Sequence, residues 1–337
     1  MKALVYTGPG SAEIREIPID PKENHAMIKV RFAGLCGTDI NIFNGKHPRA
    51  KAPLVFGHEF SGEIAHIEKN DLGLKENDRV AVNPVISCGE CSLCISGKGN
   101  ICKKLGLLGI DWDGGFAEYV NVPLSRIHKI DDEIDFDTAA LIEPLAVGIR
   151  GYKKSSLSES SHVAISGGGS IGMIVALVLE NMGIRNISII EVNDFRLRLI
   201  EKLGFKGVDA SKEDVEAYFS KSTNAKGVDV LFEASGAPPA LKNMTKLVAP
   251  SGQIVLLSVF KEPQEVNLLD INFKELDIFG SRMYSDKDFA EACVMAKTLQ
   301  HKLKELIIPK IALVDSKNIF DNNTKDSLKT LIDCTVV

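Results

Sequence analysis

Side chains typical of a zinc site lie at both ends of residues 36–59. The segment begins Cys-Gly-Thr-Asp and ends Gly-His-Glu. Zinc prefers thiolate, imidazole and carboxylate ligands, and a catalytic zinc keeps three or so protein ligands and one open position. Cys36, His58 and one or two carboxylates could supply that set. Glu143 is a further candidate, because an acidic residue in the apolar run 139–145, followed by a proline, is poorly explained as a solvated charge.

A second group of metal-binding residues is formed by four of the seven cysteines. They are Cys88, Cys91, Cys94 and Cys102, in the pattern C-x2-C-x2-C-x7-C, with glycines that allow tight turns. Disulfides are typical of small secreted chains, and this chain fits neither description. In a reducing compartment the spacing therefore predicts a four-thiolate lobe that holds a structural zinc. An iron–sulfur cluster is the main alternative, because thiolates bind it equally well.

A glycine-rich motif, G-x-G-x-x-G, follows the apolar run 162–166 and opens an apolar helix expected over 173–182. Its residues are Gly167, Gly169, Ser170, Ile171 and Gly172. Placed between a strand and a helix, these glycines allow a tight turn and close approach to a pyrophosphate, and the helix N-terminus offers N–H groups to the phosphates. The motif predicts a dinucleotide site.

An acidic residue stands where such a site requires one. Glu191 ends the strand expected over 187–190 and can accept hydrogen bonds from the adenosine ribose. Its carboxylate would repel a 2′-phosphate, so we expect NAD rather than NADP. Arg196 and Arg198 lie nearby in the sequence and weaken that preference. Flavin is less consistent with the Cys36 and His58 set, which already implies a Lewis acid.

The order of the expected elements gives a two-part chain. Residues 2–123 read as many short strands, among them 27–32, 60–67 and 78–82, and predict a β-rich domain over 1–150. After the serine-rich patch at 153–161, strands and helices alternate over 151–284, which predicts an α/β domain with a parallel sheet covered on both faces. Residues 285–337 add a helix and two short strands.

Composition excludes several classes of function. The 337 residues suit two domains, and a net charge of -5 leaves no basic surface for nucleic acid. The amino terminus lacks the apolar segment of a signal peptide, and the longest apolar run, 173–179, is too short to span a bilayer. We therefore expect a cytoplasmic protein that binds neither nucleic acid nor membranes.

Taken together, these motifs resemble the zinc-dependent medium-chain dehydrogenases, in particular the sorbitol/polyol dehydrogenase-like branch, which is close to the sugar-acid and threonine dehydrogenases. The resemblance covers nearly the whole chain. It rests on residues 36–39, 57–59, 88–102, 114–119, 141–144 and 167–172. It implies a GroES-like β domain, then a Rossmann domain, and a C-terminal segment (285–337) that returns to the first domain. In that family a cleft between the domains holds zinc and nicotinamide together.

The resemblance also implies roles for individual residues. Cys36, His58 and Glu143 match the catalytic zinc ligands, and Glu59 matches a residue that ligates the metal directly or exchanges with water. Asp39 matches the acid that orients the histidine, a partner that metal-bound imidazoles commonly require. Thr38 matches a hydroxyl that relays the proton of the substrate. Zinc would lower the pKa of the substrate hydroxyl, and hydride would pass to the nicotinamide.

Three further residues are weaker candidates for the substrate pocket. His47 falls within the ligand-bearing stretch, and Arg282 and Tyr284 follow the strand expected to end at Phe279-Gly280. A cation at Arg282 would suit a carboxylate or phosphate on the substrate. We expect an NAD-linked oxidation of a secondary alcohol such as a polyol or sugar acid. A threonine- or butanediol-type dehydrogenase and a non-catalytic nucleotide-binding descendant are the alternatives, and the resemblance implies a homodimer or homotetramer.

Overall fold

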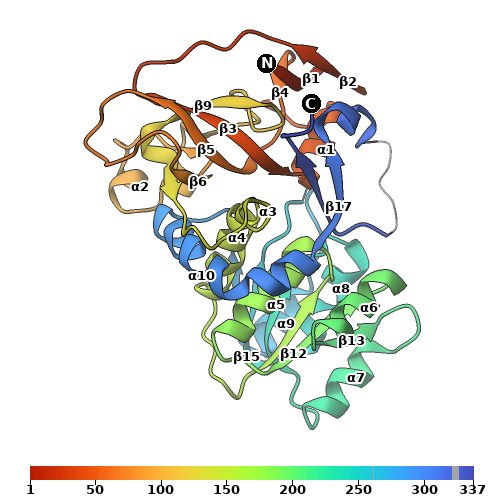
Figure 1. Ribbon diagram of the computed structural model, residues 1–337. Helices are drawn as coiled ribbons and strands as arrows, with labels where there is room; N and C mark the ends of the chain where they lie inside the picture. Colours follow the sequence, from red (N-terminus) through yellow and green to blue (C-terminus); the bar gives the residue numbers. More distant parts are fainter. Residues whose placement is uncertain (261, 321–325) are drawn as a thin grey trace. The chain divides into compact units, whose positions relative to one another are not determined.

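The computed structural model describes residues 1–260, 262–320 and 326–337. These residues form two compact units. Unit 1 comprises Met1–Pro144 and Ser285–Val337, and unit 2 comprises Leu145–Tyr284. The carboxyl-terminal segment therefore belongs to the same unit as the amino terminus, whereas unit 2 is one continuous stretch of chain (Figure 1).

Unit 1 is built on β-sheets. Its largest sheet has seven strands in the order β10-β6-β5-β3-β18-β17, with β9 also paired to β3. These strands are β3 (His25–Gly34), β5 (Glu59–Ile67), β6 (Arg79–Val82), β9 (Tyr119–Pro123), β10 (Ile127–Lys129), β17 (Ile307–Ala312) and β18 (Lys329–Asp333). Buried and more exposed residues alternate along β3, as in a strand with one face on a core. β3 and β5 lie side by side (Figure 1), and β18 pairs with β3.

Two smaller sheets and several short helices complete this unit. A three-stranded sheet has the order β2-β1-β4, and β7 pairs with β8. These strands are β1 (Lys2–Gly8), β2 (Ser11–Glu16), β4 (Leu54–Val55), β7 (Val85–Ile86) and β8 (Gly106–Leu107). The helices are α1 (Gly37–Phe43), α2 (Ser92–Ile95), α3 (Phe136–Ala139) and α10 (Asp286–Glu305), with 3-10 turns η1 (Gly99–Ile101), η2 (Leu124–Arg126) and η3 (Leu313–Asn318). Helix α4 (Ile142–Tyr152) begins in unit 1 and continues into unit 2.

Helix α10 shows why this sequence forms a long helix. Ser285 caps its amino terminus by accepting a hydrogen bond from the backbone N–H of Asp288, whose side chain in turn accepts from Ser285 N. Acidic residues occupy the first turn and lysines the last, which suits the helix dipole. Its buried residues recur three or four apart, from Phe289 to Leu303, so one face packs on the core.

Unit 2 contains a six-stranded sheet in the order β13-β12-β11-β14-β15-β16, in which every pairing is parallel. Its strands are β11 (His162–Ser166), β12 (Asn186–Glu191), β13 (Lys206–Asp209), β14 (Val228–Glu233), β15 (Val248–Leu256) and β16 (Asp277–Gly280). Its helices are α5 (Ser170–Asn181), α6 (Asp194–Lys202), α7 (Val215–Ser222), α8 (Pro238–Leu247) and α9 (Leu268–Phe273). Figure 1 shows the alternation of strand and helix along the chain. The α/β class, with a β-rich unit and a second unit that contains a parallel Rossmann sheet, is confirmed.

Several elements were not expected from the sequence. The helices α3, α7 and α9 have only four, eight and six residues, and β13 has only four. The expected strands 27–32 and 60–67 are confirmed within β3 and β5, and the expected strand 78–82 corresponds to β6, which begins one residue later. None of the described helices combines the length and apolar character that crossing a bilayer requires.

Candidate active site

Three metal-binding side chains meet in unit 1. The sulfur of Cys36, a ring nitrogen of His58 and a carboxylate oxygen of Glu59 all lie within 4.8 Å of one another. Cys36 stands at the amino end of α1, just after β3, and Glu59 begins β5 opposite Gly34 of β3. The pairing of β3 with β5 therefore joins the two ends of the segment 36–59.

Asp39 connects two of these residues. It is fully buried, and its Oδ2 accepts a hydrogen bond of 2.8 Å from the backbone N–H of Cys36. Its Oδ1 lies 3.6 Å from Nδ1 of His58. A carboxylate beside one ring nitrogen orients the imidazole so that the other nitrogen can face a metal. This geometry supports the orienting role expected for Asp39.

The polar atoms of this group fit a bound cation. Asp39 Oδ1 and His58 Nδ1 are buried without a hydrogen-bond partner among the described residues. Burial alone would lower the pKa of His58, but the negative charges of Asp39 and Cys36 raise that pKa well above its usual range. Surroundings that attract a proton so strongly also favour a divalent cation. The donor types are those that zinc prefers.

Lys329 is a member of this site that the sequence did not reveal. Its ammonium forms an ion pair with Glu59 Oε2, and both side chains are only 2% exposed. Burial alone would lower the pKa of Lys329, but the charges of Glu59, Cys36 and Glu143 raise it above its usual value. Lys329 is the first residue of β18, far along the chain from Glu59, and the pairing of β18 with β3 brings the two residues together.

The other predicted residues of unit 1 lie in different surroundings. Glu143, in the first turn of α4, is buried but does not join the group within 4.8 Å, so its ligand role stays a prediction. Thr38 is half-buried at the start of α1. His47 is half-buried, and its Nδ1 accepts from the backbone N–H of Arg49 (3.4 Å) and Ala50 (3.2 Å). Its pKa is lowered, first by burial and then by the charge of Arg49.

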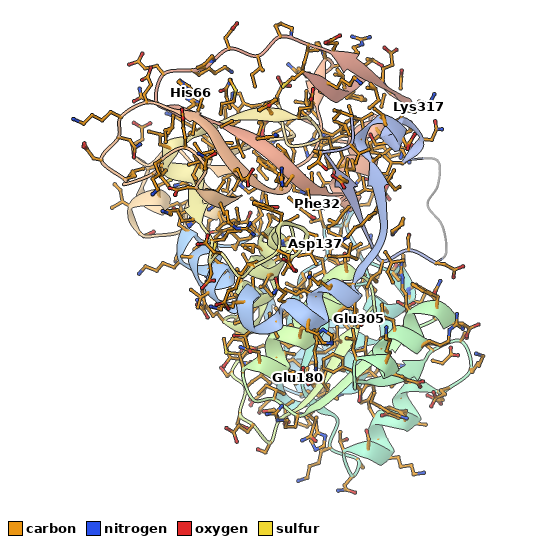
Figure 2. All side chains as sticks on the ribbon, viewed as in Figure 1. Phe32, His66, Asp137, Glu180, Glu305 and Lys317 are labelled. Atoms are coloured by element: carbon orange, nitrogen blue, oxygen red, sulfur yellow. The ribbon has the colours of Figure 1, made fainter. Side chains whose placement is uncertain are left out.

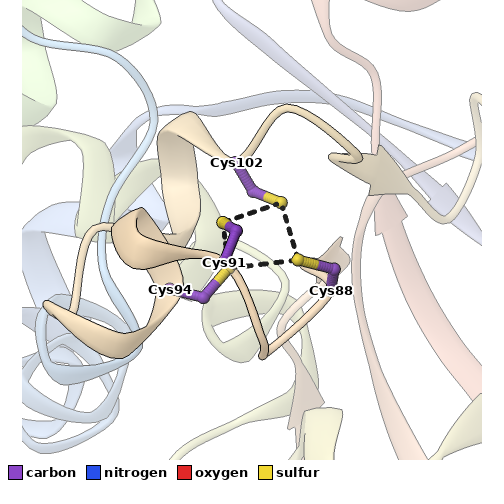
Figure 3. Close-up of side chains that lie close together, drawn as sticks. All are labelled: Cys88, Cys91, Cys94 and Cys102. Atoms are coloured by element: carbon purple, nitrogen blue, oxygen red, sulfur yellow. Dashed lines mark hydrogen bonds between the residues drawn. The ribbon is translucent and has the colours of Figure 1, made fainter.

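The four cysteines of the predicted lobe converge around one point (Figure 3). The Sγ–Sγ distances are 3.8 Å for Cys88–Cys94, 3.5 Å for Cys91–Cys94, 3.9 Å for Cys91–Cys102 and 3.5 Å for Cys102–Cys88. Disulfide sulfurs would lie about 2 Å apart. Sulfurs around one tetrahedral zinc, with bonds of about 2.3 Å, lie about 3.8 Å apart. The lobe therefore fits a single zinc ion, whereas an iron–sulfur cluster would spread its thiolates over several irons.

The surroundings of the lobe lower the pKa of one thiol and raise that of another. Hydrogen bonds from the backbone of Cys91 and Glu90 lower the pKa of the Cys88 thiol to about 6. Partial burial raises the pKa of Cys94 to about 11. The backbone N–H of Lys104 points to the sulfur of Cys102 at 3.3 Å. Because a bound cation holds thiolates together against their mutual repulsion, these groups suit a structural metal.

The glycine motif of unit 2 leaves its helix N-terminus open. Gly169 stands at the amino end of α5 and provides no side-chain cap, so Ser170 and Ile171 present backbone N–H groups there. A Cβ atom on Gly172 would collide with the carbonyl oxygen of Gly167, so only glycine permits this close approach of helix and loop. This is the cradle that a pyrophosphate needs.

Glu191 lies at the carboxyl end of β12, beside this motif. Its Oε2 accepts a hydrogen bond of 3.0 Å from Gly168 N, and its Oε1 accepts from Val192 N (2.7 Å) and Asn193 N (3.0 Å). Arg196 lies 3.6 Å from the same carboxylate. The acid is thus held in place before any ribose binds.

The two substrate candidates of unit 2 differ in exposure. Arg282 is exposed, whereas Tyr284 is only 1% exposed. Both follow β16, and their roles stay predictions.

Two family models match the chain. The model described as "Alcohol dehydrogenase GroES-like domain" matches residues 22–132. The model described as "Zinc-binding dehydrogenase" matches residues 170–298. Together with the two groups of converging ligands, these matches confirm the predicted catalytic Cys–His–Glu zinc site and the four-cysteine structural zinc site.

Curated relatives align with most of the chain. A 2-dehydro-3-deoxy-L-galactonate 5-dehydrogenase from Pseudoalteromonas atlantica is 33% identical and covers 99% of both chains. An L-threonine 3-dehydrogenase from Bacillus velezensis is 37% identical over 83% of both chains. A sorbitol dehydrogenase from Halalkalibacterium halodurans is 34% identical over 91% of both chains.

Solved structures agree with the fold. A zinc-binding dehydrogenase from Sinorhizobium meliloti 1021, bound to NADP, has a TM-score of 0.93 and 30% identity over 98% of both chains. The alcohol dehydrogenase rspB from Escherichia coli CFT073, in complex with NADH, has a TM-score of 0.90 and 31% identity over 99% of both chains.

Proposed function

Because the chain belongs to the zinc-containing medium-chain alcohol dehydrogenases, we propose that it oxidises a secondary hydroxyl of a small polyol or sugar acid, with NAD as hydride acceptor. The observation that carries this proposal is the convergence of Cys36, His58 and Glu59 within 4.8 Å, with His58 and Glu59 buried. Three ligand types with one position left open are typical of catalytic rather than structural zinc.

The residues of unit 1 have distinct tasks in this reaction. Cys36 and His58, with Glu143 or Glu59, would hold the metal, and Asp39 keeps the His58 ring oriented through its 3.6 Å contact. When bound, zinc supplies a Lewis acid that lowers the pKa of a substrate hydroxyl. The hydroxyl of Thr38 accepts the released proton and passes it outward. His47, whose pKa is lowered, stays neutral and lines the substrate pocket.

The residues of unit 2 bind the nucleotide. The N–H groups at the start of α5 receive the pyrophosphate, and Glu191 receives the ribose hydroxyls. A carboxylate held by three backbone N–H groups repels a 2′-phosphate, which supports NAD. Arg196, 3.6 Å from that carboxylate, is the group that could admit NADP. When bound, the nicotinamide accepts the hydride.

A second candidate function is the oxidation of a hydroxy amino acid or a butanediol. The L-threonine 3-dehydrogenase of Bacillus velezensis, at 37% identity, favours it. We rank it second because the sugar-acid dehydrogenase of Pseudoalteromonas atlantica aligns with 99% of the chain. A nucleotide-binding descendant without turnover is a third reading, but a buried, open metal site has no use in such a protein.

We also propose that the chain assembles as a homodimer or homotetramer. β16 is a terminal strand of the unit 2 sheet, and an unpaired strand edge is a template for pairing with another chain. Exposed apolar side chains on the neighbouring helix α9 support this: Leu268, Leu269 and Phe273. Light scattering after size exclusion should give a mass of two or four chains, and a monomer would contradict the proposal.

The experiment that tests the activity is a substrate panel. Zinc-loaded protein and NAD are mixed, in separate assays, with polyols, sugar acids, L-threonine and butanediols. NADH formation is followed by absorbance. Turnover confined to polyols or sugar acids supports the first candidate. Turnover confined to threonine or butanediol replaces it with the second, and NADH binding without any turnover supports the third.

A further inference from the structure

Lys329 is a buried cation next to a site built for another cation. It is the first residue of β18, in the carboxyl-terminal segment of unit 1. Its Nζ pairs with Glu59 Oε2 and donates a hydrogen bond of 3.1 Å to the backbone carbonyl of Leu35. Both charged side chains are 2% exposed, and a lysine is almost never buried so completely without a charged partner.

The sheet makes room for this pair at one position. Gly34 of β3 lies between Glu59 of β5 and Leu331 of β18. A Cβ atom on Gly34 would collide with Glu59 Oε2 and would come within 3.1 Å of Lys329 Cε. The side chains of Glu59 and Lys329 therefore meet next to the backbone of Gly34, where β3 has no side chain. Their contact is part of the packing of the sheet.

The positive charge of Lys329 affects both metal binding and the Glu59 carboxylate. Two cations in a buried site repel each other, so an ammonium beside a zinc site opposes metal binding. The same ammonium forms an ion pair with the carboxylate of Glu59. That carboxylate also supplies one oxygen to the group of possible metal ligands formed by Cys36, His58 and Glu59. Glu59 cannot give its full charge to a metal and to Lys329 at the same time.

We propose that Lys329 is a positioning residue of the metal centre, which holds the Glu59 carboxylate back from the metal so that a coordination position stays open for substrate. Cys36 and His58, with Glu143, then remain as the resident ligands, and Glu59 is held beside them. The inference rests on the proposed function only through the presence of the metal centre. It can be tested without any substrate, so a wrong substrate assignment leaves it standing.

The test is the cobalt spectrum of the metal centre. Co2+ replaces zinc in the Cys36–His58 site, while the cysteine lobe keeps its zinc. Cobalt reports on the site because its visible absorption bands weaken as its coordination number rises from four to five. In Lys329→Met the freed Glu59 should ligate the metal. We expect weaker bands and a loss of Co2+ to a chelator that is slowed by about tenfold or more, the scale on which neighbours of metal ligands act.

Two variants serve as controls. Lys329→Arg keeps the charge and should restore the native spectrum. Lys310→Met removes another lysine of the same segment, whose Nζ lies 2.6 Å from Asp137 and 5.3 Å from the ring centre of Phe32. Asp137 and Phe32 are labelled in Figure 2, and Asp137 does not belong to the metal group. Lys310→Met should leave the cobalt spectrum unchanged.

A purely structural lysine would behave differently. Lys329→Met would then lose Co2+ faster than the native protein, and its bands would keep their native intensity; either result overturns the proposal. If Lys329→Met does not fold, Glu59→Gln decides, because its amide can still accept from Lys329. The proposal expects Glu59→Gln and native protein to share one cobalt spectrum. If the cobalt spectrum of Glu59→Gln differs from that of the native protein, Glu59 is a resident ligand and the proposal is overturned.

Discussion

The carboxylate of Asp39 lies 3.6 Å from Nδ1 of His58 and also accepts the backbone N–H of Cys36. One buried acid thereby fixes two residues of the metal group, although it is not itself a member of it. The metal site depends on this acid for both the direction of the imidazole and the start of α1.

We predict that Asp39→Asn weakens zinc binding by about 10–100-fold, the usual cost of losing the partner of a metal-bound histidine. The amide keeps the size of the side chain but removes the charge that faces His58. Zinc affinity is measured by competition with a chelator. Asp131→Asn is the control, because this exposed acid pairs with Lys297 at 2.8 Å, away from the metal group. Equal affinity in Asp39→Asn and native protein would contradict the orienting role.

We predict that Cys36→Ser and Cys91→Ser each remove one zinc but differ in their effect on folding. Cys91 belongs to the lobe whose four sulfurs hold a loop together, so its loss should lower Tm by about 5 °C, the shift that about 2 kcal/mol produces in a large chain. Cys36→Ser should abolish turnover with a native-like Tm. Metal analysis and thermal unfolding measure both effects.

The control for the cysteine variants is Cys293→Ser. Burial raises the pKa of the Cys293 thiol to about 12, and the residue belongs to neither metal group. It should keep both zinc ions. A full loss of folding in Cys36→Ser and Cys91→Ser alike would argue against separate catalytic and structural sites.

We predict that Glu191→Gln weakens NADH binding by about tenfold, because the amide makes poorer hydrogen bonds to the ribose than a carboxylate does. NADPH binding should weaken less, or improve, because the charge that repels the 2′-phosphate is gone. Glutamine can still accept from Gly168 N, so the loop should keep its shape. Calorimetric titration of both nucleotides measures the ratio. An equal loss for NADH and NADPH would show that Glu191 does not discriminate between them.

We predict a pH-dependent contribution of Asp209, which ends β13 beside Glu191. A hydrogen bond from Lys212, with further ones from Ser211, lowers the pKa of Asp209 to about 2. Since the folded-state pKa lies below the unfolded value of about 4, the stabilisation is present above that value and is lost as the pH falls towards 2. Asp209→Asn should therefore be less stable than native protein at pH 6 and equally stable near pH 2 in urea unfolding. A constant difference at both pH values would contradict this.

The parts of the site that could be predicted from the sequence are those built from neighbouring residues. The spacing of Cys88, Cys91, Cys94 and Cys102 places the four sulfurs within one loop, so local geometry is enough. The glycine motif and Glu191 follow in the same way from one strand–turn–helix–strand unit. The sequence identifies Cys36 and His58 as ligand types, but their convergence depends on the pairing of β3 with β5.

Lys329 could not be predicted, because its role arises from strand pairing across the chain. A lysine at the start of a short strand normally faces water, and the pairing of β18 with β3 is what buries Lys329 against Glu59. The helices α3 and α7 do not follow from the sequence for a different reason. They have four and eight residues, and helices this short are marginal by themselves, so the packing of each unit stabilises them.

The measurement that tests the account most directly is metal content per chain, together with NAD-dependent oxidation of the alcohol panel by the same preparation. We predict two zinc ions per chain and NADH formation with one class of secondary alcohol, and the loss of one zinc and all turnover in Cys36→Ser. Protein that holds both zinc ions and binds NADH but oxidises no alcohol would contradict the proposed enzyme and support a nucleotide-binding protein instead.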